Sequence, residues 1–134
     1  MGALARLEIY VNRSDKSMGK ASSPAVLHLE DLKLPAVAHK ILHRIVAGYH
    51  PQRVIVYGSF ARDDVHEGSD LDLIIVKPTD ERFIDRIERV LAFCDGEMTV
   101  EPLVYTKKEI DSMLAEGNAF LENALKEGVV VYEA

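Results

Sequence analysis

Two short runs near the middle of the sequence are apolar at every position, and they constrain the fold more than any other feature of the chain. They are residues 54–57 and residues 73–76. A strand with one wet face alternates apolar and polar residues, whereas a strand covered on both faces is apolar throughout. The two runs therefore predict central strands of a sheet with helices packed on it.

Helices are predicted where apolar residues recur at helical spacing. This spacing occurs in residues 35–48, 83–95, 107–117 and 118–128. Thr106 and Glu109 predict a capping box at the start of the third of these helices, and Asn118 predicts an N-cap for the fourth. We expect each helix to turn its apolar side toward the sheet.

The second of these helices is expected to bury an apolar stripe. The stripe consists of Phe83, Ile84, Ile87, Val90, Leu91 and Cys94. Cys94 is the only cysteine, so neither an intramolecular disulfide nor a multi-cysteine zinc site can form. Its place on the stripe is typical of a small core residue. The five histidines lack the mutual spacing of zinc ligands and are expected to be structural or solvated.

Two further strands are expected, at residues 98–105 and 129–132. Pro102 has no backbone N–H and therefore favours an edge position for the first of them, or an irregularity just after Glu101. The resulting order is helix, strand, strand, helix, strand, helix, helix, strand. We predict an α/β (α+β) domain with a small mixed β-sheet and helices packed on it, over residues 35–134.

Residues 1–34 are predicted to form a short strand at 4–11 and a flexible arm at 12–24, where Ser, Lys and Gly are frequent. Acidic residues outnumber basic ones by 22 to 16, and no Lys/Arg stripe occurs, so we expect no long nucleic-acid partner. The start does not have the pattern of a signal peptide, and no apolar run is long enough to span a membrane. We expect a cytoplasmic protein without a membrane partner.

Gly58 and Ser59 stand where the first apolar run gives way to a short helical turn. Backbone N–H groups at such a turn point outward, and a glycine lets a phosphate approach them closely. The Ser59 hydroxyl can donate a hydrogen bond to a phosphate oxygen. The pair indicates an anion site, although a plain turn is the alternative when it is taken alone.

Asp70 and Asp72 are two residues apart at the start of the second strand, so both carboxylates are predicted on one face, with Leu71 and Leu73 on the other. Their α-carbons would be about 6.6 Å apart. At an effective dielectric of about 20, two charges at that distance repel by roughly 2.5 kcal/mol. We therefore expect a cation, and Mg²⁺ prefers carboxylate and phosphate oxygens. A solvated strand end is the alternative.

Glu101 is an acidic residue inside the otherwise apolar run 100–104. If this strand lies beside the one that carries Asp70 and Asp72, Glu101 completes a cluster of three carboxylates. The alternative is a solvent-facing side chain on an edge strand.

Together these residues resemble the signature of the nucleotidyltransferase superfamily of DNA polymerase beta, and within it the minimal nucleotidyltransferases. The matching residues are Gly58, Ser59, Phe60, Ala61, Arg62, Ser69, Asp70, Leu71, Asp72, Leu73 and Glu101. The signature covers residues 53–76, and the order of elements extends the likeness over about 35–134. Asp63 stands where these families commonly have Gly, and Glu101 stands where Asp is usual.

The resemblance implies a polymerase beta-like nucleotidyltransferase fold and transfer of a nucleoside monophosphate from a nucleoside triphosphate, with ATP as the expected donor. It assigns catalysis and the binding of two Mg²⁺ ions, or Mn²⁺ in their place, to Asp70, Asp72 and Glu101. It assigns nucleotide binding to Gly58, Ser59, Arg62 and Ser69. For Arg62, an ion pair with Asp63 or Asp64 is the alternative to a phosphate clamp.

The resemblance also implies a partner. Minimal nucleotidyltransferases are commonly encoded with an all-helical HEPN protein, typically a ribonuclease toxin, and the expected role is an antitoxin that adenylylates this partner. A non-catalytic nucleotide-binding antitoxin is one alternative, favoured by the longer side chain of Glu101. An aminoglycoside-type nucleotidyltransferase is another, disfavoured because residues 35–134 leave no room for an acceptor domain. A homo-oligomer is left open.

Overall fold

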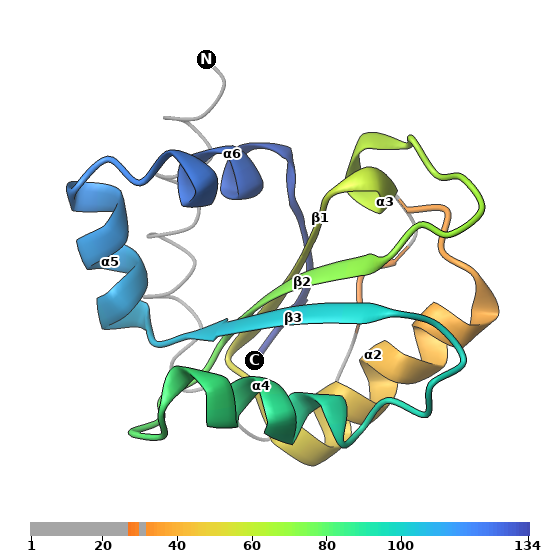
Figure 1. The fold of residues 1–134 in the computed structure, drawn as a ribbon, viewed down its shortest axis with the longest axis horizontal. Helices are drawn as coiled ribbons and strands as arrows, with labels where there is room; N and C mark the ends of the chain where they lie inside the picture. The colour runs from red at the N-terminus through yellow and green to blue at the C-terminus, as the bar shows by residue number, and fades with distance from the viewer. Residues whose placement is uncertain (1–26, 30–31) are drawn as a thin grey trace.

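The computed structural model describes residues 27–29 and 32–134, so the predicted strand at 4–11 and the predicted arm at 12–24 lie outside the described residues. A four-stranded mixed sheet with strand order β3-β2-β1-β4 forms the centre of the domain (Figure 1). The strands are β1 (Arg53–Tyr57), β2 (Leu71–Val76), β3 (Val100–Tyr105) and β4 (Val129–Glu133). β1 runs antiparallel to β2 and β4, whereas β2 and β3 are parallel. The prediction of a mixed sheet is confirmed.

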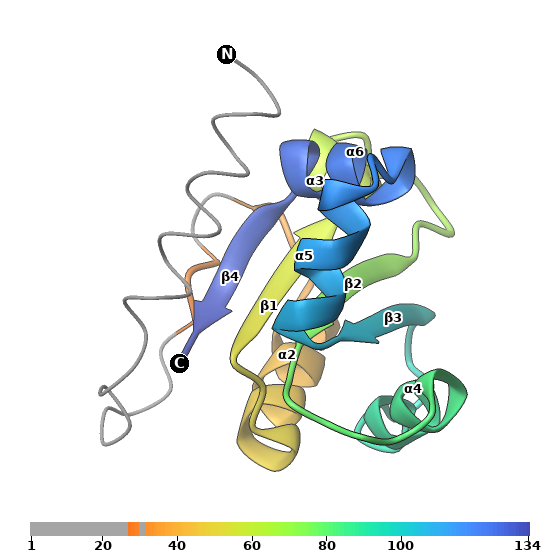
Figure 2. The same cartoon turned by 90° about the vertical axis from the view of Figure 1, so that its left-hand side faces the viewer.

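Helices cover both faces of this sheet (Figures 1 and 2). α2 (Ala36–Tyr49) and α4 (Phe83–Leu91) pack on one face, and α5 (Lys107–Ala115) and α6 (Ala119–Glu127) pack on the other. In β1, Val54 and Val56 enter the core under α2, while Ile55 enters the core under α6. The apolar runs thus supply two cores at once, as their lack of alternation predicted.

Local signals placed several boundaries correctly. Thr106 and Glu109 form the predicted capping box of α5, and the Asn118 side chain accepts a hydrogen bond from the backbone N–H of Leu121 at the start of α6. β3, which contains Pro102, lies at one edge of the sheet formed by the described residues. None of the helices in residues 27–29 and 32–134 has both the length and the apolar character that crossing a membrane requires.

The prediction for α4 was wrong in two respects. The helix ends at Leu91, so Cys94 lies beyond it, half-buried against the larger core. Val90 is buried, but Phe83, Ile84 and Leu91 are 39%, 55% and 40% exposed. The apolar residues therefore do not form a single buried stripe.

Arg86 takes a buried place on α4 instead. Its guanidinium donates hydrogen bonds to the backbone oxygens of Glu81 at 2.8 Å and Val104 at 3.1 Å, and to both carboxylate oxygens of Glu109 at 2.7 and 3.1 Å. A buried charge is tolerated when its donors are satisfied in this way. Periodicity treats arginine as an outward residue, and this is why it assigned α4 the wrong face.

Candidate active site

The end of one strand and the beginnings of two others lie next to one another at one end of the sheet. β1 ends at Tyr57, while β2 and β3 begin at Leu71 and Val100, and the pairing of the strands sets these ends side by side (Figure 1). Asp72 is in register with Tyr57 on one side and with Glu101 on the other. Residues in register on adjacent strands project from the same face. The sheet therefore brings Asp72 and Glu101 together, as the sequence predicted for neighbouring strands.

Asp70 directly precedes β2, which begins at Leu71 and not at Asp70 as predicted. Leu71 and Leu73 are fully buried, in agreement with their predicted place on the core face. Asp70 lies close enough to Asp72 for its negative charge to raise the pKa of the Asp72 carboxyl. The two aspartates are thus neighbours, although only one of them is part of the strand.

Negative charges outnumber positive charges around Asp72 at this end of the sheet. The pKa of Asp72 is raised to about 6, first by burial and then by the negative charges of Glu101 and Asp70, with Arg62 opposing the shift. Burial likewise raises the pKa of Tyr57, and the charges of Asp72 and Glu101 add to the effect. Carboxyl groups with strongly shifted pKa values are frequent at functional sites, so the strand ends around Asp72 are the candidate active site.

These carboxylates suit a hard divalent cation in their chemistry, since all are oxygen donors and two project from positions in register. With the side chains as they stand, however, no three His, Cys, Asp or Glu residues within 27–29 and 32–134 are arranged to hold a metal ion. The donor atoms are of the type that Mg²⁺ prefers, but the side chains of the described residues do not form a metal site as they are placed. The assignment of Asp70, Asp72 and Glu101 as metal ligands stays a prediction.

Gly58 forms the turn from β1 into the short helix α3 (Ser59–Arg62) and has a φ angle of +77°. Residues with a side chain rarely adopt this backbone conformation, whereas glycine adopts it without strain. A Cβ atom here would also overlap a carboxylate oxygen of Asp72. The turn requires glycine both for its conformation and because the Asp72 carboxylate lies directly against it.

Glu127, the last residue of α6, also belongs to this site, and the sequence analysis missed it. One carboxylate oxygen accepts a hydrogen bond from the backbone N–H of Gly58 at 2.8 Å, and both oxygens lie within 3.3 Å of Arg62 Nη1. Arg62 thus pairs with Glu127, which contradicts the alternative that it pairs with Asp63 or Asp64. The contact spans 69 positions of the sequence, and no local pattern could have indicated it.

Ser59 begins helix α3 and Ser69 lies in the loop that follows it, and each takes part in a hydrogen bond of this segment. The backbone oxygen of Ser59 accepts from the N–H of Asp64 at 2.9 Å, and the Ser69 hydroxyl oxygen accepts from the N–H of His66 at 2.9 Å. These bonds fix the path of the chain from Gly58 to Asp70. Nucleotide binding by either serine stays a prediction.

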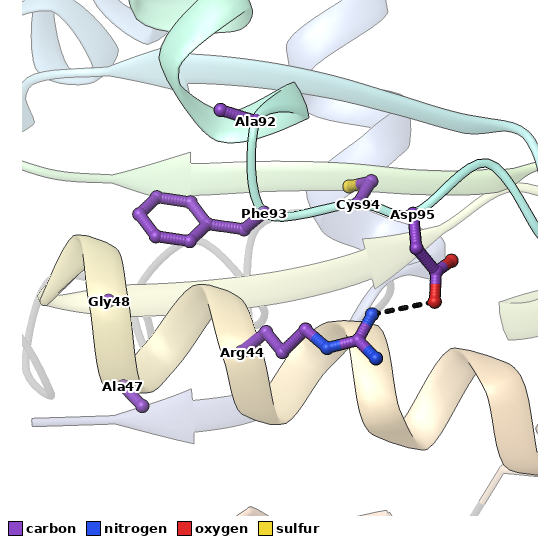
Figure 3. Close-up of a pocket in the computed structure, with 7 residues that line it drawn as sticks. All are labelled: Arg44, Ala47, Gly48, Ala92, Phe93, Cys94 and Asp95. Atoms are coloured by element: carbon purple, nitrogen blue, oxygen red, sulfur yellow. Dashed lines mark hydrogen bonds and ion pairs between the residues drawn. The ribbon is translucent and has the colours of Figure 1, made fainter.

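Two open hollows lie on the α2 side of the domain. The first has a volume of about 570 Å³, is lined mainly by apolar side chains, and reaches the loop of the candidate site at Phe60 and Ser69. The second, of about 520 Å³, lies between α2 and the segment after α4 (Figure 3). It is lined by Arg44, Ala47, Gly48, Ala92, Phe93, Cys94 and Asp95.

The second hollow offers little chemistry. Arg44 is already paired with Asp95 at 2.8 Å. Burial raises the pKa of the Cys94 thiol, which lowers the fraction of the reactive thiolate at neutral pH. Of the two hollows, the first is the one that reaches the loop of the candidate site, on the face of the sheet opposite Asp72 and Glu101.

A glycine turn lies beside two acids in register where strands of a mixed sheet end and begin, which leaves a backbone that an anion can approach next to carboxylate oxygens. Residues 39–131 match the family described as the nucleotidyltransferase domain. The match covers more than half of the chain and includes every residue of the candidate site, and the chain belongs to this family. Nucleotidyl transfer is therefore the class of activity that the family supports.

Among solved structures, the fold is similar to that of a candidate nucleotidyltransferase from Sulfolobus solfataricus. The two share 24% sequence identity over 70% of this chain and 75% of that chain, with a TM-score of 0.50. This likeness concerns the fold. No curated protein matches the chain.

Proposed function

We propose that this nucleotidyltransferase transfers a nucleoside monophosphate, with ATP as the expected donor, onto a hydroxyl group of a partner protein. The observation that carries the proposal is the register of Asp72 with Glu101, beside the glycine turn at Gly58. This arrangement sets oxygen donors that suit Mg²⁺ next to a backbone that a phosphate can approach.

In the proposed reaction the acceptor oxygen forms a bond to the α-phosphorus, the bond from that phosphorus to the bridging oxygen breaks, and pyrophosphate leaves. Divalent ions bound at the acids would neutralise phosphate charge. Asp70 and Asp72 would hold these ions, and Glu101 would hold the ion nearest the acceptor. The Glu101 side chain is exposed at the edge strand, where it can accept the proton of the acceptor hydroxyl.

The triphosphate would be bound by the turn and loop that precede β2. The backbone of Gly58 and the hydroxyl of Ser59 are proposed to bind its outer phosphates. The Arg62 guanidinium has the planar donor geometry that suits phosphate oxygens. Ser69 is proposed to complete the nucleotide-binding set.

A protein acceptor is favoured by what the described surface offers. The hollow that reaches the loop at Phe60 and Ser69 is open and largely apolar, and it is not a closed pocket for a second small substrate. It lies on the α2 face of the sheet, whereas Asp72 and Glu101 project from the other face. The net charge of -6 disfavours a nucleic-acid backbone. From the resemblance to minimal nucleotidyltransferases we infer an all-helical HEPN partner and an antitoxin role for this chain.

A non-catalytic antitoxin is the second candidate. It is favoured by the side-chain arrangement, in which no three acids of the described residues form a metal-binding group. Glu101 is one methylene longer than the aspartate usual at this position, which displaces its carboxylate. Such a protein would bind the nucleotide and neutralise its partner by contact alone.

The test is to incubate the purified chain with a helical protein encoded beside it, Mg²⁺ and each nucleoside triphosphate in turn, and to weigh both proteins by mass spectrometry. We expect one added nucleoside monophosphate on the partner. Asp72→Asn should abolish the addition, and Asp64→Asn, which changes an exposed acid in the loop before β2, should not.

The remaining outcomes separate the alternatives. A tight complex with no added mass would establish the non-catalytic antitoxin. Neither binding nor labelling would exclude this partner and direct the search to small-molecule hydroxyl acceptors.

A further inference from the structure

We infer that the Glu127 side chain occupies the place of a phosphate group at Gly58 and Arg62, and that the triphosphate must displace it in order to bind. This inference rests on the proposed function and adds to it a residue that sets the affinity for nucleotide. It concerns a carboxylate that the family resemblance did not single out.

The contacts of Glu127 are those that a phosphate would make. A backbone N–H, from Gly58, and a guanidinium, from Arg62, converge on its carboxylate, at 2.8 Å and at 3.2 and 3.3 Å respectively. Carboxylates and phosphates are both recognised by charge-assisted hydrogen bonds from such donors. The single backbone N–H of Gly58 cannot serve Glu127 and an outer phosphate at the same time.

The charge of Glu127 opposes the nucleotide as well. Its negative charge is close enough to contribute to the raised pKa of Asp72, together with the charges of Glu101 and Asp70. A triphosphate bound at the site adds further negative charge next to these acids. Rotation of Glu127 away from Gly58 removes one negative group and releases two donors in the same step.

The fold fixes the backbone of Glu127 and leaves the side chain able to rotate. The next residue, Gly128, packs so tightly that a Cβ atom there would lie 2.6 Å from the backbone oxygen of Ala124 and 2.7 Å from Ile55 Cγ2. β4 then pairs with β1, the strand that ends beside Gly58. The Glu127 side chain is 28% exposed, so its carboxylate can turn into water without a shift of α6.

The test compares Glu127→Gln with the wild-type chain by isothermal titration calorimetry, using inorganic triphosphate, ATP with Mg²⁺, and adenosine as probes. Glutamine keeps the size of the side chain and removes its charge. We expect inorganic triphosphate and ATP to bind about tenfold more tightly to the variant. The uncharged amide of glutamine accepts weaker hydrogen bonds from Gly58 and Arg62 than the carboxylate does, so a phosphate displaces it more easily. Adenosine, which carries no phosphate, should bind equally to both.

Glu122→Gln is the matched control, since it neutralises a glutamate near the other end of α6 and should leave all three affinities unchanged. Thermal unfolding of the ligand-free variants checks that each is folded. Glu127→Ala is the second variant and should show the same gain for triphosphate.

Equal or weaker binding of triphosphate by folded Glu127→Gln and Glu127→Ala would overturn the inference and leave the proposed function in place. Absence of triphosphate and ATP binding by every variant, wild type included, would overturn both. A gain that extends to adenosine would show that Glu127 acts through the shape of the site and not through the phosphate position, and would also overturn the inference.

Discussion

The two ends of strand β3 differ in whether the charges next to them are paired. At the end near Val104, the buried guanidinium of Arg86 meets the carboxylate of Glu109 and two backbone oxygens. At the beginning of the strand, Glu101 lies in register with Asp72, beside Asp70, and acids outnumber cations. The same strand therefore carries one end where charges are matched and one where they are not.

The pKa values of the two ends show what this difference means. Hydrogen bonds from Arg86 lower the pKa of Glu109, so its charged form stabilises the fold. Burial and neighbouring acids raise the pKa of Asp72, so its charged form is disfavoured in the fold without a bound cation. The matched end serves stability, and the unmatched end is where a bound ligand can supply the missing charge.

The largest effect is expected at the unmatched end. Glu101→Gln should reduce nucleotidyl transfer by more than about 100-fold. Loss of a residue that only supports a metal ligand already costs up to about 100-fold, and Glu101 is proposed to be a ligand itself. Binding of the triphosphate should persist through Gly58, Ser59, Asp70 and Asp72. Transfer and nucleotide binding are measured side by side, with Glu97→Gln as the control in the exposed segment before β3. Full transfer by Glu101→Gln would assign that side chain to the solvated edge.

At the matched end, Glu109→Ala should lower the free energy of unfolding by about 2–3 kcal/mol, because it leaves the buried charge of Arg86 without its carboxylate partner. The value lies at the low end because Glu109 is 42% exposed. Urea unfolding measures the change. Asp111→Ala breaks an exposed pair with Lys107 on the same helix and should cost less than about 0.5 kcal/mol. Equal costs would remove the distinction between the two pairs.

The matched end should also weaken in acid. Because the folded-state pKa of Glu109 is lowered, its contribution is fully present above the unfolded pKa of about 4.3 and is lost as the pH falls through the folded value. Unfolding of the wild type and of Glu109→Gln between about pH 6 and pH 3 tests this. The difference between them should shrink toward the acid end, and a constant difference would mean that the Glu109 charge is not involved.

The smallest effect is expected from Asp70→Asn in the absence of metal. Removing one of the crowded negative charges should raise the free energy of unfolding by up to about 1 kcal/mol. The same variant should lose the rise in melting temperature that Mg²⁺ with ATP gives the wild type, since a ligand stabilises only the state that binds it. A wild type without any such rise would show that the acids do not bind metal.

The sequence predicted those parts of the fold and site that depend on nearby residues. The apolar runs identified β1 and β2, the capping box located α5, and the short separation of Gly58 from Asp72 allowed the turn and the acids to be joined. The misassigned features depend on contacts across the fold. Arg86 is buried because Glu109 and Val104 accept its hydrogen bonds. Glu127 lies beside Gly58 because β4, which follows it in the chain, pairs with β1.

The position of Tyr57 has an optical consequence. The chain has no tryptophan, so its near-ultraviolet emission comes from its five tyrosines. The ring of Tyr57 packs edge-on against Phe120, with ring centroids 5.8 Å apart, and the residue is in register with Asp72. The charge of Asp72 is close enough to raise the pKa of the Tyr57 phenol, and an excited phenol is a stronger acid that loses emission when it gives its proton to a nearby carboxylate. When a cation engages Asp72, emission from Tyr57 is expected to brighten, and Tyr57→Phe should remove the change, so the site carries its own fluorescent reporter.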